Sequence, residues 1–133
     1  MVINPPCKEI EDLIRPLGTL IAVEDKTEMA AMRTITALMS PFYELCCAVT
    51  EWGMENSLSE PASKAYTTSF FGALATMAGQ TEEGKLKDLA EEMTPGGLNW
   101  QATNYLKDNE AFRHWQIALD AIMERVTGVK KQK

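Results

Sequence analysis

The sequence predicts an all-α fold, a helical bundle with a long kinked first helix that follows a short helix and strand. From Asp25 onward, apolar residues recur at the spacing of one helical face almost without a break. Ahead of Asp25, the apolar and partly β-branched run Thr19–Val23 is typical of a strand. One strand does not make a sheet, so we expect helix packing to supply the core.

The first segment is predicted to be a short helix from Cys7 to Arg15, which Pro16 ends. A turn at Leu17 and Gly18 then leads into the strand. The long helix is expected to start at Asp25, which can form a capping box with Glu28.

The apolar pattern of this long helix continues from about Lys26 to Ser57. Pro41 falls inside it, and a proline removes one backbone hydrogen bond and clashes with the preceding turn. We therefore expect one helix with a kink at Pro41.

Ser59 is the expected N-cap of the next helix, over residues 60–80, and Pro61 is tolerated in its first turn. Small residues recur four positions apart along this helix and predict the close approach of another helix: Ser69, Ala73, Ala75 and Gly79. The rest of the chain predicts three more helices, a short one from Thr81 to about Glu92, one over 99–107, and a last one capped by Asp108. The last helix carries an apolar seam: Phe112, Trp115, Leu119, Ile122 and Val126.

Composition excludes several classes of function. A chain of 133 residues has the size of one small domain, and its net charge of −6 argues against a nucleic-acid or anionic-membrane partner. No apolar run reaches the roughly 18 residues of a membrane span, and the features of a signal peptide are missing. Cys7, Cys46 and Cys47 show no metal-ligand spacing, and unpaired thiols favour a cytoplasmic protein.

Other reactive side chains have plain structural interpretations. His114 has no carboxylate or thiol partner at a suggestive spacing, so we interpret it as a surface or interface residue. Cys46 and Cys47 lie among apolar residues in mid-helix, which favours a place in the core. Glu91 and Glu92 are adjacent, so their side chains diverge on a helix and are expected to be solvated. No set of residues has metal-ligand spacing.

The most informative stretch is the loop Thr94–Asn99. Pro95 fixes one φ, and Gly96 and Gly97 allow positive φ and a close backbone approach. The helix that follows begins with unpaired N–H groups, so the loop suits a small carboxylate or a phosphate. A turn of this composition can also do no more than reverse the chain.

Short motifs keep a fixed order along the chain: Val23–Asp25, Met29, Pro41 with Tyr43, Leu86–Asp88, Thr94–Gly97 and Asn109–Arg113. Together they resemble the C-terminal domain of pyrroline-5-carboxylate reductases over roughly residues 19–127. In that family the loop reads Ser-Pro-Gly-Gly-Thr-Thr, and the last helix starts with Gly-Phe-Arg.

This resemblance implies an NAD(P)-dependent oxidoreductase that transfers hydride to the C=N carbon of a small cyclic imino acid, or the reverse. It implies that residues 1–24 are the remnant of the end of a nucleotide-binding domain. Residues 25–133 would then be a helical dimerisation and substrate-side domain, forming an intertwined homodimer. The chain contains no Gly-x-Gly, so NAD or NADP is expected to bind the parent protein but not this chain. The chain would be an excised fragment or a natural remnant, and inactive alone.

In the resembling family, the loop holds the substrate carboxylate, and its last Thr lies beside the imine nitrogen. The resemblance therefore assigns Thr94, Gly96, Gly97, Leu98 and Asn99 to substrate binding, and places Asn99 at the catalytic position. An Asn amide donates a hydrogen bond but is no proton-transfer acid near pH 7, which indicates a diverged substrate or orientation. Asn99 as a plain helix cap is the alternative. A rival function is a non-catalytic helical module for self-association.

Overall fold

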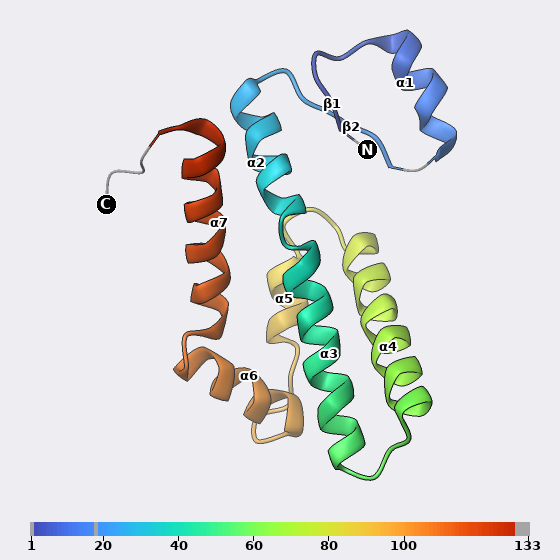
Figure 1. The fold of residues 1–133 in the computed structure, drawn as a ribbon, viewed down its shortest axis with the longest axis vertical. Helices are drawn as coiled ribbons and strands as arrows, with labels where there is room; N and C mark the ends of the chain where they lie inside the picture. The colour runs from blue at the N-terminus through green and yellow to red at the C-terminus, as the bar shows by residue number, and fades with distance from the viewer. Residues whose placement is uncertain (1, 18, 130–133) are drawn as a thin grey trace. The chain divides into compact units, whose positions relative to one another are not determined.

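The computed structural model describes residues 2–17 and 19–129, so the turn expected at Gly18 lies outside the described residues. The described residues are mostly helical, as predicted (Figure 1). The elements, in chain order, are β1 Val2–Ile3, α1 Lys8–Ile14, the short 3₁₀ turn η1 Arg15–Leu17, β2 Ile21–Ala22, α2 Lys26–Thr36, α3 Met39–Glu55, α4 Glu60–Gln80, α5 Leu86–Glu91, α6 Leu98–Asp108 and α7 Ala111–Thr127.

The described part of the chain forms two compact units. Among the described residues, one unit consists of 2–17, 19–39 and 112–129, and the other of 40–111. The first unit holds β1, α1, β2, α2 and α7, and the second holds α3 to α6. These units are defined by how compactly their residues pack. The boundary predicted after residue 24 instead separates an expected remnant of a nucleotide-binding domain from the helical domain.

The first unit contains a small parallel sheet that the sequence did not predict. Val2 pairs with Ile21, and Ile3 pairs with Ala22. The Asn4 side chain extends this pairing, because its Nδ2 donates to the Val23 carbonyl over 2.9 Å. Val23 is 5% exposed, and among the described residues it is the one hydrophobic side chain that is fully enough covered to count as buried. The strand expected over 19–23 is thus shorter than predicted, and it has a partner.

Helices α2 and α7 meet inside the first unit, as Figure 1 shows. Thr34 of α2 is 3% exposed, and its hydroxyl lies 3.4 Å from the sulfur of Met123 in α7. The same hydroxyl lies 2.8 Å from the Ala30 carbonyl one turn earlier in α2. A buried threonine therefore lies at the contact between α2 and α7. Its hydroxyl can donate to a carbonyl of its own helix, so the buried polar group has a hydrogen-bond partner.

The predicted single helix over 26–57 is wrong, because the chain forms two helices there. The N–H groups of Ala37 and Leu38 bond three residues back, to Thr34 and Ile35, which tightens the end of α2. Pro41 is the third residue of α3 and needs no donor there. Proline lacks the N–H that would have bonded to the carbonyl of Ala37, so the helix breaks upstream of Pro41 and not at it.

The capping box at Asp25 is confirmed. The Thr27 N–H donates to Asp25 Oδ1 over 2.6 Å, and the Asp25 N–H donates to Glu28 Oε2 over 3.5 Å. The bond from Thr27 lowers the pKa of the Asp25 carboxyl below its ordinary value, because it stabilises the charged form.

This lowered pKa predicts a pH dependence of the start of α2. A carboxyl whose folded pKa is depressed stabilises the fold at pH values above its unfolded pKa. That contribution is lost as the pH falls through the folded pKa. We expect the amides of the first turn of α2 to lose protection from hydrogen exchange on acidification below about pH 4. Asp25→Asn, which keeps a capping oxygen but does not titrate, should remove most of this local change.

Helices α3 and α4 form an antiparallel hairpin in the second unit (Figure 1). Ser57 ends α3 with a positive φ of 78°, and the Leu58 N–H bonds to the Gly53 carbonyl over 3.0 Å. Gly53 and Ser63 meet at the crossing, where Ser63 is 2% exposed. The Ser63 hydroxyl donates to the Thr50 carbonyl over 2.8 Å, which joins the two helices.

The bounds of α4 match the prediction, whereas two predicted caps are wrong. Thr81 ends α4 instead of starting the next helix, and its hydroxyl donates to the Met77 carbonyl over 3.0 Å. Asp108 is the last residue of α6, and α7 begins only at Ala111. Ser59 occupies the predicted N-cap position of α4, although its side chain makes no capping bond.

Candidate functional site

The loop before α6 is a tight turn whose glycines are required by its geometry. The Gly97 N–H donates to the Thr94 carbonyl over 2.9 Å, with Pro95 and Gly96 between them. Gly96 has a φ of 76°, which fits a type II turn with proline at its second position. A Cβ on Gly97 would lie 3.0 Å from the Thr94 carbonyl oxygen. Each glycine therefore has its own structural reason, independent of any ligand.

The turn leaves a smaller set of anion donors than the sequence suggested. Because the Gly97 N–H closes the turn, it is not available to a ligand. Leu98 begins α6, and the first N–H groups of a helix have no acceptor inside it. Thr94 and Leu98 are exposed, so the loop is open to solvent. The amide of Leu98, the Thr94 hydroxyl and the positive end of α6 are what this loop offers to a carboxylate.

Asn99 is the second residue of α6 and is exposed. The N-cap of α6 is Gly97, so the alternative that Asn99 merely caps this helix is wrong. Its amide is therefore free of a capping role and lies in the first turn, beside the loop. The five predicted substrate residues are neighbours in the sequence, so their proximity follows from the chain itself, and their role in substrate binding stays a prediction.

The remaining reactive residues lie outside this loop. His114 is exposed, and so are Glu91 and Glu92, as expected for solvated side chains. No group of side chains suited to a metal ion occurs among the described residues. The described helices include none long and apolar enough to cross a membrane.

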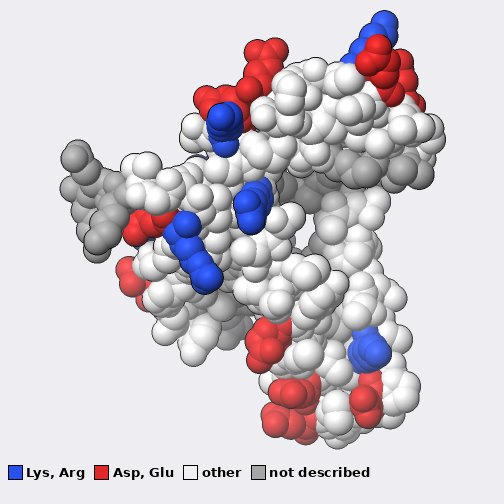
Figure 2. Space-filling view, turned by 45° about the horizontal axis from the view of Figure 1, so that its top comes forward, with Lys and Arg blue, Asp and Glu red and all other residues white. Residues whose placement is uncertain are grey.

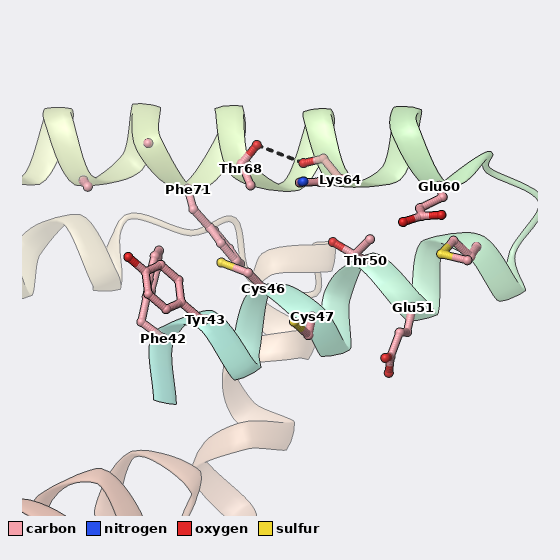
Figure 3. A pocket seen from close by; sticks show the side chains of 13 residues that line it. Phe42, Tyr43, Cys46, Cys47, Thr50, Glu51, Glu60, Lys64, Thr68 and Phe71 are labelled. Atoms are coloured by element: carbon pink, nitrogen blue, oxygen red, sulfur yellow. Dashed lines mark hydrogen bonds between the residues drawn. The ribbon is translucent and has the colours of Figure 1, made fainter. Parts of the chain in front are cut away.

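Cys46 and Cys47 do not lie in a core within this chain, which corrects the expectation from their apolar neighbours. Cys46 is half-buried and Cys47 is exposed. Both line a groove of about 850 Å³ between α3 and α4, shown in Figure 3. Aromatic side chains lie at one end of this groove, where the Phe42 and Phe71 ring centroids are 6.2 Å apart.

The sequence offered no sign of this groove, because its walls come from two helices. One wall is supplied by α3 between residues 42 and 54, and the other by α4 between residues 60 and 75. At the end opposite the aromatic residues lie Glu51, Glu60 and Lys64. Only the antiparallel pairing of the helices brings these residues together.

Charged side chains are scattered over the face of the molecule that Figure 2 draws. On the face drawn in Figure 2, acidic and basic side chains form small separate groups with wide uncharged surface between them. The formal net charge of the chain is −6. A nucleic-acid site needs clustered Lys and Arg, so this face gives no support to one.

Two solved structures share the fold of this chain. One is a pyrroline carboxylate reductase from Plasmodium falciparum with NADP bound, at a TM-score of 0.75 and 18% identity over 91% of this chain. The other is a pyrroline-5-carboxylate reductase from Coxiella burnetii, at a TM-score of 0.76 and 20% identity over 94% of this chain. No family model and no curated protein sequence matches the chain.

The similarity covers only part of those enzymes. This chain spans 46% of the Plasmodium falciparum protein and 47% of the Coxiella burnetii protein. Over nearly its whole length, then, the chain has the fold of just under half of a pyrroline-5-carboxylate reductase.

Proposed function

We propose that this chain is the helical substrate-side and dimerisation domain of an NAD(P)-dependent oxidoreductase of the pyrroline-5-carboxylate reductase type. The observation that carries the proposal is the tight turn at Thr94–Gly97 leading into the N-terminus of α6, within a fold shared with two such enzymes. The substrate would be a small cyclic imino acid, and its carboxylate would bind at this turn.

The geometry of the turn supports a distinct proposed role for each loop residue. The Leu98 amide and the Thr94 hydroxyl would donate to the carboxylate, and the dipole of α6 would favour its negative charge. Gly96 and Gly97 would hold the turn that positions these donors. The Asn99 amide would donate to a polar atom of the ring without transferring a proton. A proton for an imine nitrogen would then come from water or from another part of the parent enzyme.

A mutation in the turn should weaken carboxylate binding. Gly96→Ala forces a side chain into a φ of 76°, which costs about 1–3 kcal/mol. We expect the affinity for L-proline, used as a cyclic carboxylate probe, to fall about tenfold. The measurement is an NMR titration that follows the amides of Gly96, Leu98 and Asn99.

Gly84→Ala is the matched control for this titration. Gly84 has a φ of 79° in the turn between α4 and α5, and no atom lies within 4 Å of the position that a Cβ would take there. The strain is therefore similar, but the carboxylate turn is untouched. Equal loss of affinity in both variants, or no shift of the loop amides at millimolar L-proline, would contradict the assignment.

The residues of this chain do not fit a dinucleotide. No Gly-x-Gly occurs in the sequence, and the sheet in the described residues has two strands of two residues each. We therefore expect the chain by itself not to bind NADH or NADPH. Calorimetric titration should show no heat of specific binding, and micromolar binding to one site would contradict this prediction. In the parent, the cofactor would bind a separate domain.

We also expect self-association. The second unit exposes large apolar side chains to water, including Trp52 at 65%, Tyr66 at 71% and Met77 at 58% exposure. Removing such side chains from water is favourable. A homodimer would cover them.

The second candidate function, a non-catalytic self-association module, uses the same apolar surface but not the turn. The exposed apolar side chains are compatible with it for the isolated chain, whereas the retained turn and the shared fold support the enzyme for the parent. The two candidates differ in one measurement. Oxidation of NADPH with 1-pyrroline-5-carboxylate by the full-length parent supports the reductase, and its absence supports the module.

A further inference from the structure

Leu98 is the most exposed large hydrophobic side chain among the described residues, at 84% exposure. It is the first residue of α6, and its amide is the donor proposed for the carboxylate. A single exposed leucine on a protein surface needs no explanation. This one belongs to the residue that would hold the ligand, so its side chain would take part in whatever contacts the ligand makes.

Helix geometry places the Leu98 side chain beside that ligand. The Cα–Cβ bond of a helical residue tilts toward the N-terminus of its helix. The free N–H groups of the first turn point toward the same end. A carboxylate held by the Leu98 amide therefore has the isobutyl group of Leu98 next to it. Thr94 and Asn99 bring polar groups to the loop, whereas Leu98 forms an apolar wall.

We infer that Leu98 is a specificity-determining residue, which selects cyclic carboxylates with hydrocarbon on the ring carbon next to the one that bears the carboxylate. The inference rests on the proposed carboxylate site and narrows its substrate class. Contact with Leu98 removes apolar surface of the ligand from water, which is favourable. A hydroxyl at the same ring carbon would lose water without gaining a hydrogen bond, because a leucine side chain has no polar atom.

Ligands that differ in one substituent test this inference. The 3-methyl and 3-hydroxy derivatives of L-proline carry groups of similar size and opposite polarity. Each is used as its cis and its trans isomer, because Leu98 meets one face of the ring. NMR titrations that follow the amides of Gly96 and Asn99 give the dissociation constants. In at least one isomer pair, the hydroxy compound should bind about tenfold more weakly than the methyl compound.

Two variants show whether Leu98 causes this preference. Leu98→Thr puts a hydroxyl in place of the apolar wall and should bring the ratio of the two dissociation constants to about one. A general weakening of carboxylate binding cancels in this ratio. Leu86→Thr is the matched control, because Leu86 is likewise the first residue of its helix, α5, and is 62% exposed. This variant should keep the ratio of the wild type.

The contrary outcomes separate this inference from the proposed function. If the loop amides shift with none of the ligands, L-proline included, the carboxylate site is refuted and the inference falls with it. If L-proline binds but both isomer pairs give a ratio near one in the wild type, the site stands and the role of Leu98 is refuted. A tenfold ratio that survives in Leu98→Thr, or that Leu86→Thr also abolishes, shows that the preference has another source.

Discussion

Replacing Ala73 by arginine is expected to break the homodimer. The unsubstituted chain should sediment as a dimer at micromolar concentration, because α3 and α4 expose large apolar side chains such as Trp52 and Met77. Ala73 lies on α4, on the side away from the α3–α4 groove. An unpaired charge buried in an interface costs about 3–5 kcal/mol, so the dissociation constant should rise by at least about a hundredfold.

The control for this prediction keeps the small size of the residue. Ala73→Ser adds a hydroxyl that can bond to a carbonyl of its own helix, so the dimer should persist. Sedimentation velocity over a range of concentrations measures the association of each variant. A wild-type chain that stays a stable monomer would refute the predicted dimer. An Ala73→Arg chain that associates as tightly as the wild type would show that this side of α4 is not part of the dimer interface.

Adding one methyl group at Gly53 is expected to lower the free energy of unfolding by about 1 kcal/mol. A Cβ there would overlap the Ser63 hydroxyl oxygen and lie 3.2 Å from Ser63 Cβ and 3.3 Å from Leu58 Cδ1. The Ser63 hydroxyl cannot turn away without losing its bond to the Thr50 carbonyl. Overpacking costs about 1–3 kcal/mol, and the higher helix propensity of alanine offsets about 0.5–1 kcal/mol of it.

Gly79→Ala is the matched control. Gly79 also lies within a helix, and no atom comes within 4 Å of a Cβ placed there. This variant should be as stable as the wild type or slightly more stable. Denaturant unfolding at one fixed protein concentration compares them, since the stability of a dimer depends on concentration. A Gly53→Ala chain as stable as Gly79→Ala would show that the two helices separate at little cost.

The sequence predicted those helix starts and turns whose signals lie within a few neighbouring residues. Helix α4 begins where predicted, at Glu60, because Pro61 favours the first turn of a helix and needs no tertiary partner for this. The capping box at Asp25 is confirmed for the same reason. The Thr94–Gly97 turn likewise follows from proline and glycine chemistry alone.

Features that depend on distant partners were missed or misplaced. Strand β1 has two residues and no periodicity, and only its pairing with β2 makes it a strand. The break after Thr36 was missed because the apolar spacing continues through it. The groove, and the exposure of Cys47, depend on how α3 and α4 pair, which the pattern of either helix alone does not contain.

The contact between Thr34 and Met123 also affects how this protein is made. These residues are 89 positions apart, and the whole second unit lies between them in the chain. A ribosome adds about 5–20 residues per second, so α2 emerges roughly 4–18 s before its partner in α7 exists. During that interval Thr34, which is buried in the folded chain, lacks its contact with α7. Synthesis rate and chaperone capture at this stage would therefore govern the yield of folded protein.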